Sequence, residues 1–289
     1  MSKKRSIGEI LYGFFLLNHP GPVAIHIIGV AIFAFVAARS HLVWGVLLLV
    51  IGAHAAMQSS IAMMNDYCDR RLDALTKPAK PIVRGLVLPR EALVASIFMM
   101  VLMVVLLLFL PPLALLLSLC YLALGQSYNF GLKSTPWSGL VFALFIPLIP
   151  LYALAGVGNL PLTAFWILPL GSLLGVVLNL ANSLPDIEGD SAGGANTLAV
   201  KLGVRGVFIV CPLLIALDVV LMGVLLVSGA VAASVWVIGG VLAGTVLAVG
   251  AMVLFFGPQK PIQTRKWYFY LVTLFCLLLG TTWLVLVAF

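Results

Sequence analysis

Long apolar segments, separated by short polar ones, run along the whole chain. A helix that crosses a membrane needs about 20 mostly apolar residues. We find nine windows of that kind, at 20–38, 42–64, 91–109, 112–127, 137–156, 161–182, 206–228, 231–256 and 267–287. The apolar runs are continuous and do not alternate with a period of two, which argues against a transmembrane β-barrel. The pattern predicts an all-α integral membrane protein, a bundle of nine transmembrane helices.

The composition agrees with this prediction. Of the 289 residues, 63% are hydrophobic and 9% are charged, which is typical of a membrane protein and not of a soluble domain. No segment suggests a separate soluble domain. The four cysteines have no spacing typical of a metal or redox site. We therefore expect a single transmembrane domain over residues 1–289.

The basic residues predict the orientation of the protein. If nine helices alternate, all 16 Lys and Arg residues except Arg39 fall on one face. The positive-inside rule places that face, with the N-terminus, in the cytoplasm of a cell or inner membrane. Lys3, Lys4 and Arg5 precede a short apolar run that we interpret as a retained interfacial helix, not a signal peptide. Topology thus explains the net charge of +7, which does not indicate nucleic-acid binding.

Six of the nine acidic residues lie in two short polar stretches. The first, NDYCDRRLD, occupies residues 65–73 after the second apolar window. The second, NSLPDIEGD, occupies residues 182–190 after the sixth window, so both fall on the predicted cytoplasmic face. Ionisable groups beside membrane-length apolar segments are costly, so each stretch is a candidate functional site. The alternative is that these residues only cap helices and solvate loops.

Both stretches share one spacing of oxygen-bearing side chains. Asn65, Asp69 and Asp73 follow one another at intervals of four residues, which places them on one face of a helix. The same Asn-x-x-x-Asp-x-x-x-Asp pattern returns at 182–190, although Pro185 interrupts a regular helix there. The repeat suggests two pseudo-repeated halves, with a boundary near residue 136.

Such clusters of carboxylates repel one another unless a cation lies between them. Oxygen ligands without His or Cys suit a hard cation such as Mg²⁺, which also takes phosphate oxygens. Two clusters can therefore hold a diphosphate through two Mg²⁺ ions. Basic side chains that follow the acids can neutralise phosphate charge, or they can be only the positive-inside signal. They are Lys77, Lys80, Arg84, Lys201 and Arg205.

These motifs resemble those of the UbiA superfamily of intramembrane prenyltransferases. The first is Asn-Asp-x-x-Asp-x-x-x-Asp followed by Lys80-Pro81-Ile82, and the second is Asp186-x-x-x-Asp190 followed by Thr197-Leu198-Ala199-Val200-Lys201-Leu202-Gly203. The resemblance implies a helical bundle around a central cavity that opens toward lipid. It also implies Mg²⁺-dependent ionisation of a polyprenyl diphosphate. The family usually has Arg at the position of Lys80.

The resemblance assigns roles to individual residues. It implies that the catalytic groups are Asn65, Asp66, Asp69, Asp73, Asp186 and Asp190. All of these except Asp66 would be metal ligands. The implied diphosphate-binding residues are Lys77, Lys80, Arg84, Lys133, Lys201 and Tyr128. Tyr128 and Lys133 belong to a third, looser motif.

We expect transfer of the prenyl group to an aromatic or other lipophilic acceptor, such as a quinone precursor, within membrane lipid. A terpene cyclase that needs no acceptor is one alternative, and a secondary transporter with intramembrane acids is another. Asp218, in the middle of an apolar window, is expected to bond to a neighbouring helix, the alternative being a proton relay. His26 and His54 are expected to be packed inside the bundle, the alternative being an acceptor cavity.

Overall fold

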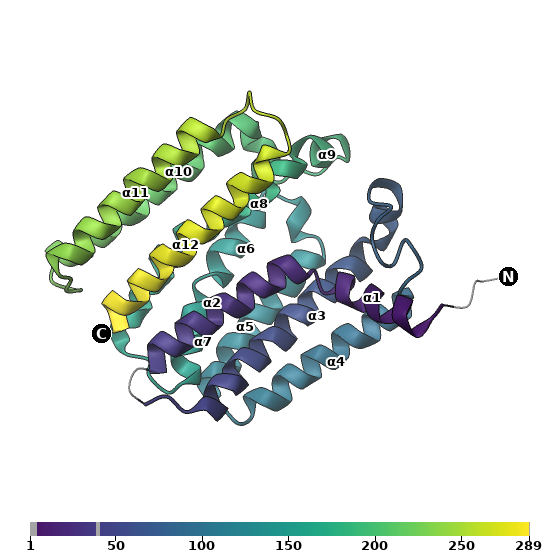
Figure 1. Ribbon diagram of the computed structural model, residues 1–289, viewed down its shortest axis with the longest axis horizontal. Helices are drawn as coiled ribbons and strands as arrows, with labels where there is room; N and C mark the ends of the chain where they lie inside the picture. Colours follow the sequence, from purple (N-terminus) through teal and green to yellow (C-terminus); the bar gives the residue numbers. More distant parts are fainter. Residues whose placement is uncertain (1–4, 39–40, 289) are drawn as a thin grey trace. The chain divides into compact units, whose positions relative to one another are not determined.

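The computed structural model describes residues 5–38 and 41–288, and every regular element in these ranges is helical (Figure 1). Lys3, Lys4 and Arg39, which the orientation argument uses, lie outside the described residues. The α-helices are α1 (Ile7–Leu17), α2 (Pro20–Ala38), α3 (Trp44–Thr76), α4 (Pro89–Leu107), α5 (Pro112–Asn129), α6 (Ser138–Phe145), α7 (Leu148–Gly156), α8 (Ile167–Ser183), α9 (Ile187–Ala192), α10 (Leu198–Val227), α11 (Val235–Phe255) and α12 (Thr264–Ala288).

Helices occupy all nine predicted windows, so the predicted fold class is confirmed. In the described part of the chain, eight helical segments are long and apolar enough to cross a membrane. The remaining window, 112–127, is α5, whose last turn, Gln126-Ser127-Tyr128-Asn129, lowers its mean hydropathy. The window at 137–156 is divided between α6 and α7, with Pro147 at the break.

Helix α3 continues well beyond its predicted end at residue 64. It has 33 residues, which corresponds to about 50 Å at 1.5 Å per residue. Because the hydrocarbon core of a bilayer is only about 30 Å thick, the last turns of α3 extend past it. Those turns carry the first acidic motif, so its carboxylates need not be buried in lipid.

Two compact units make up the chain, one comprising Met1–Phe130 and Tyr152–Asn159, the other Gly131–Leu151 and Leu160–Phe289. Each unit contains one acidic motif. In the first unit, α3 packs against α2, α4 and α5. Gly125 allows the close approach of α5, since a Cβ there would lie 2.7 Å from the side chain of Ile61. The predicted pseudo-repeat of the two halves stays a prediction.

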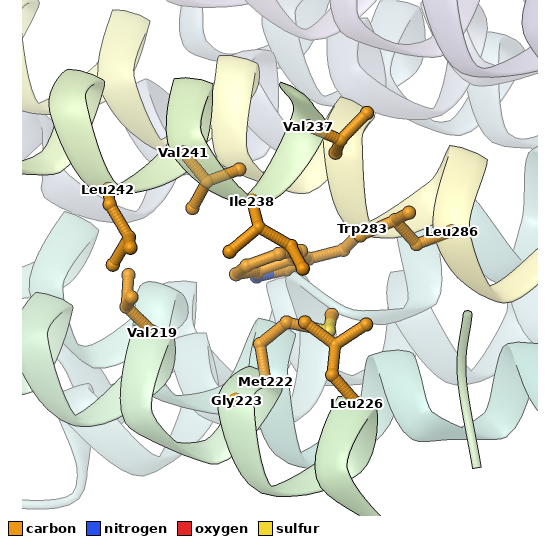
Figure 2. A pocket seen from close by; sticks show the side chains of 10 residues that line it. All are labelled: Val219, Met222, Gly223, Leu226, Val237, Ile238, Val241, Leu242, Trp283 and Leu286. Atoms are coloured by element: carbon orange, nitrogen blue, oxygen red, sulfur yellow. The ribbon is translucent and has the colours of Figure 1, made fainter. Parts of the chain in front are cut away.

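In the second unit, α8 packs against α6, α10 and α12, while α11 packs against α10 and α12. Gly175 lets α8 approach α6, because a Cβ there would lie 2.3 Å from the backbone oxygen of Phe142. An apolar cavity of about 60 Å³ is lined by α10, α11 and α12, and Figure 2 shows the side chains that line it. Trp283 lines it and donates an indole N–H to Asp218 Oδ2 at 2.8 Å. Asp218 is therefore bonded to a neighbouring helix, as predicted.

Candidate functional site

The first acidic motif lies on the last turns of α3, in continuous helix. Asn65, Asp69 and Asp73 are therefore neighbours on one helical face, as their spacing predicted. Asp73 is buried, with 4% of its surface exposed, while Asn65 and Asp69 are half-buried. A row of side-chain oxygens thus follows the end of α3.

The side chain of Asn65 is oriented by helix α5. Its Nδ2 donates to Asn129 Oδ1 at 3.0 Å. Asn129 is held in turn, because its own Nδ2 donates to the backbone oxygen of Ile61 at 2.9 Å and to Gln126 Oε1 at 3.1 Å. With its nitrogen directed at α5, Asn65 turns its carbonyl oxygen away from Asn129, and an amide oxygen is a ligand that hard cations accept. Nothing in the sequence indicated that Asn129 supports Asn65.

Asp66 differs from the other acids of the first motif, because it belongs to a three-residue cluster. Lys80 Nζ donates to Asp66 Oδ1 at 2.5 Å, and His19 Nε2 lies 2.7 Å from the same oxygen. Asp66 has 1% of its side chain exposed, whereas His19 and Lys80 have 27% and 24%. The predicted catalytic Asp66 is thus an ion-pair partner of the predicted diphosphate ligand Lys80.

The loop after α3 contains a tight turn at residues 80–85. Lys80-Pro81-Ile82 opens a turn in which the Arg84 N–H donates to the Lys80 oxygen at 2.9 Å. Gly85 closes it with a φ of +69°, a conformation that favours glycine. Ile82 packs against a buried apolar cluster formed by Leu17, Met63, Val87 and Ala92. The loop is therefore anchored by apolar packing beside the ion pair, which fixes the position of Lys80.

The second motif spans the end of α8, a 3₁₀ turn at Leu184–Asp186 and the short helix α9. Pro185 is tolerated because it lies at the start of the 3₁₀ turn, where its missing N–H breaks no helical bond. Asn182 and Asp186 are exposed and Asp190 is half-buried. Pro185 does interrupt the regular α-helix, as predicted, but the interruption is a 3₁₀ turn and helix continues on both sides of it.

Glu188, the remaining acid of the second motif, forms an ion pair with Arg265 on α12. Both guanidinium Nη atoms donate to the carboxylate, at 2.7 and 2.8 Å. Arg265 is 8% exposed on its side chain and also donates to the backbone oxygen of Leu184 at 3.2 Å. This bidentate pair joins α12 to the turn that carries Asp186. Nothing in the sequence indicated this role for Arg265.

The structure therefore separates the six clustered acids into two groups. Asp66 and Glu188 make ion pairs with basic side chains of their own unit. The other four form two Asp-x-x-x-Asp pairs, one pair in each unit, on helical backbone. Those four are the acids that the sequence predicted as metal ligands.

The donor set fits Mg²⁺ by its chemistry, since it consists of carboxylate and amide oxygens. Within residues 5–38 and 41–288, no three His, Cys, Asp or Glu side chains converge closely enough to hold a metal by themselves. Mg²⁺ does not require such a cage, because it commonly binds one or two carboxylates and completes its shell with water and phosphate oxygens. Asn65, Asp69 and Asp73 in one unit, and Asp186 and Asp190 in the other, are the residues that would hold it.

Predicted diphosphate-binding residues accompany both motifs in sequence. In the first unit, Lys77 and Arg84 are exposed beside Lys80, and Tyr128 lies in the last turn of α5. In the second unit the residues are Lys133, in the 3₁₀ turn Leu132–Ser134, and Lys201, exposed in the first turns of α10. Thr197 caps α10 by accepting the Val200 N–H at 3.1 Å. Gly203 then bends the helix with a φ of +66°.

A family model described as the UbiA prenyltransferase family matches residues 26–277. The match contains both acidic motifs and the helices that carry them. The chain belongs to the UbiA prenyltransferase family. The resemblance inferred from the motifs is thereby confirmed, and the protein is an integral membrane prenyl transferase. This membership sets aside the transporter alternative.

Several relatives share the name digeranylgeranylglyceryl phosphate synthase. The protein from Methanoregula boonei is 32% identical over 200 residues, which cover 67% of this chain and 69% of the relative. The protein from Natronomonas pharaonis is 34% identical over 143 residues, 49% of this chain and 52% of the relative. The match to the second relative thus spans about half of its length.

Solved structures share the fold. One, of a digeranylgeranylglyceryl phosphate synthase, superposes with a TM-score of 0.74 at 19% identity, covering 96% of this chain and 99% of the other. A UbiA homologue from Archaeoglobus fulgidus bound to GPP and Mg²⁺ superposes with a TM-score of 0.66 at 16% identity, covering 94% and 99%. The predicted all-helical membrane architecture is therefore shared by this family.

Proposed function

We propose that this protein transfers a prenyl group from a polyprenyl diphosphate to a glyceryl phosphate lipid in a Mg²⁺-dependent reaction. The observation that carries the proposal is the pair of Asp-x-x-x-Asp motifs, one in each unit, each followed in sequence by basic residues. Two such motifs supply oxygen ligands for Mg²⁺, and the basic side chains supply donors for phosphate oxygens. A UbiA homologue with bound GPP and Mg²⁺ supports a prenyl diphosphate donor and Mg²⁺ here.

The acceptor follows from the name of the relatives. Digeranylgeranylglyceryl phosphate carries two prenyl groups on one glyceryl phosphate, so its synthesis ends with transfer to a hydroxyl of a singly prenylated glyceryl phosphate. We infer that geranylgeranyl diphosphate is the donor and geranylgeranylglyceryl phosphate the acceptor. The aromatic or quinone-precursor acceptor expected from the sequence has no counterpart among these relatives, and the test below decides between the two.

The chemistry is a substitution at an allylic carbon. The C1–O bond of the donor breaks, and its electron pair leaves with the diphosphate. Bound Mg²⁺ supplies electrostatic stabilisation of that leaving group. Asn65, Asp69 and Asp73 would hold Mg²⁺ in the first unit, Asp186 and Asp190 would do so in the second, and Lys80 would donate to the phosphate oxygens. The acceptor oxygen bonds to C1, and its proton passes to water or to the released diphosphate.

Water must be kept from the allylic cation, because it would intercept the prenyl group. The long apolar helices of this chain supply walls that exclude water and match a prenyl tail. We place both motifs at the cytoplasmic end of their helices, where the basic residues gather under the positive-inside rule. A soluble diphosphate can leave from that end.

The direct test incubates the purified protein in lipid nanodiscs with geranylgeranyl diphosphate and Mg²⁺. Parallel reactions receive geranylgeranylglyceryl phosphate, 4-hydroxybenzoate or no acceptor, and products are identified by mass spectrometry. The proposal predicts digeranylgeranylglyceryl phosphate together with one equivalent of diphosphate. Prenylated 4-hydroxybenzoate as the sole product would overturn the acceptor, and a cyclised hydrocarbon without acceptor would establish a terpene cyclase.

A further inference from the structure

Asp66 lies in the acidic motif, yet the structure places it against a lysine and a histidine. We propose that His19 and Asp66 are positioning residues that orient Lys80 toward the diphosphate of the donor, and that Asp66 is not a metal ligand. This inference rests on the proposed function, because it assigns the part of the site that receives the diphosphate. It also gives His19, which lies between α1 and α2, a role in the reaction.

The geometry brings two donors to a single oxygen. His19 Nε2 lies 2.7 Å from Asp66 Oδ1, a separation that requires a proton between the two atoms. Lys80 Nζ lies 2.5 Å from the same Oδ1 and 3.0 Å from His19 Nε2. Both donors thus converge on Oδ1, and their mutual proximity follows from sharing it.

The ammonium group of Lys80 has N–H donors left for a ligand. A lysine ammonium has three N–H donors and no acceptor. One of them is directed at Asp66, which leaves two for phosphate oxygens. Lys80 remains 24% exposed, so these donors can reach a ligand, whereas Asp66 is almost completely enclosed. A lysine held by its carboxylate loses less conformational freedom when it binds the diphosphate.

The burial of Asp66 argues against metal ligation. Its second oxygen, Oδ2, is buried and has no hydrogen-bond partner among the described residues. An atom that water does not reach is closed to Mg²⁺, which keeps several waters of its own. Asp69, one helical turn further along α3, is half-buried and thus less enclosed than Asp66. We therefore assign different roles to Asp66 and Asp69 of α3.

His19 is held in place by an unusual backbone conformation. Its φ is +47°, the one positive φ among the described residues other than glycine. Left-handed backbone at a residue with a bulky side chain is disfavoured, and such residues cluster at functional sites. Here the conformation joins α1 to α2, with the His19 N–H bonded to the Leu16 oxygen at 3.0 Å. The turn directs the imidazole to Asp66.

Helix α1 fixes this turn relative to the Lys80 loop. Arg5 donates to both oxygens of Glu91 at 2.7 Å and to the backbone oxygen of Leu86 at 3.1 Å. Gly13 lies directly on the loop, because a Cβ there would be 2.8 Å from the side chains of Leu86 and Val87. These contacts attach α1 to the segment that follows Lys80. They thereby hold His19, which follows α1, close to Lys80.

The test compares His19→Ala, His19→Gln, Asp66→Asn and Lys80→Ala with the control His41→Ala, which alters an exposed histidine away from the motif. We expect His19→Ala and Asp66→Asn to raise the KM for the donor about tenfold. The kcat and the Mg²⁺ concentration for half-maximal activity should change less than about twofold. His19→Gln, which keeps an N–H donor at the same reach, should restore most of the affinity.

A double-mutant cycle separates positioning from a general structural effect. If His19 acts only through Lys80, adding His19→Ala to Lys80→Ala leaves the KM of the single Lys80→Ala variant unchanged. Independent, multiplicative effects would overturn the inference. An Asp66→Asn variant that needs more Mg²⁺ while its KM for the donor is unchanged would also overturn it, because that is the behaviour of a metal ligand.

Calorimetric binding of geranylgeranyl thiodiphosphate, which is not turned over, separates this inference from the proposed function. A wild-type protein that binds the thiodiphosphate but transfers no prenyl group would contradict the function and still test the positioning pair through Kd. Unchanged Kd in His19→Ala, beside an active wild type, would contradict the positioning pair alone. A wild type that binds no thiodiphosphate would contradict both.

Discussion

At the scale of single residues, one hydrogen bond decides which atom of Asn65 can face a cation. An asparagine presents either an amide nitrogen or a carbonyl oxygen, and only the oxygen binds a metal. The contact from Asn65 Nδ2 to Asn129 Oδ1 fixes that choice. Asn129 is itself 4% exposed and held by two further bonds, so it would be a rigid support for the proposed metal site.

We predict that Asn129→Ala weakens Mg²⁺ activation without removing activity. Loss of one hydrogen bond costs about 1 kcal/mol, so the Mg²⁺ concentration for half-maximal diphosphate release should rise about fivefold. The matched control is Asn159→Ala, which removes an asparagine bonded to the backbone oxygen of Ala37 in the same unit. An Asn129→Ala variant with the same Mg²⁺ dependence as this control would show that Asn65 needs no support from α5.

At the scale of elements, the bend in α10 depends on one glycine. Gly203 has a φ of +66° and a ψ of 169°, so it divides the helix into a short N-terminal part with Lys201 and a long apolar part. Residues with a Cβ rarely adopt this conformation. The bend therefore sets the direction in which the first turn of α10, with its basic side chain, leaves the membrane helix.

The Gly203→Ala substitution should destabilise the protein by about 1–2 kcal/mol, since alanine is strained at positive φ. It should also raise the KM for the donor, because Lys201 is displaced. Thermal melting in detergent and donor kinetics provide the two measurements. Gly223→Ala is the control in the same helix, where an added Cβ meets no neighbour. Equal melting temperatures for the two variants would contradict the importance of the bend.

The sequence predicted the elements better than their ends. Each of the nine apolar windows contains helix, and eight helical segments of the described chain are long and apolar enough to cross a membrane, because burial in lipid requires a continuous apolar run. They placed the end of α3 at residue 64, although the helix continues to Thr76. Hydropathy indicates which residues lie within the bilayer, and a helix can continue beyond them. The division between α6 and α7 was missed as well, because Pro147 lies inside an unbroken apolar run.

Site residues could be predicted only in part, for a physical reason. The four-residue spacing predicted that Asp69 lies near Asp73 and that Asp186 lies near Asp190, since residues four apart share one face of a helix. The spacing could not predict the contact of Asp66 with His19, because His19 is 47 residues away in the chain. Arg265, 77 residues from Glu188, was missed for the same reason.

At the scale of the whole molecule, charge predicts how the protein crosses the membrane. Basic residues follow alternate helices, and the loop between α11 and α12 contains Lys260 whereas the loop between α10 and α11 has no charged residue. The positive-inside rule therefore places Lys260 in the cytoplasm and the α10–α11 loop outside. The same rule predicts that both acidic motifs face the cytoplasm.

Single cysteines test this orientation in a variant without the four native cysteines. We expect Ala232→Cys, in the α10–α11 loop, to react in intact cells with a maleimide that cannot cross the membrane. Lys260→Cys should react only after the cells are permeabilised. Both positions are exposed, so access to the reagent depends on the side of the membrane. Labelling of Lys260→Cys in intact cells would reverse the proposed orientation.

The central proposal is that both Asp-x-x-x-Asp motifs are needed for release of diphosphate from the donor. The most direct measurement is diphosphate release from geranylgeranyl diphosphate with Mg²⁺ and acceptor, for wild type, Asp69→Ala, Asp186→Ala and the paired acid Glu188→Gln. Either alanine variant should lose about 100-fold or more in kcat/KM, while folded Glu188→Gln should retain activity. Wild-type rates of release by both Asp69→Ala and Asp186→Ala would contradict the account.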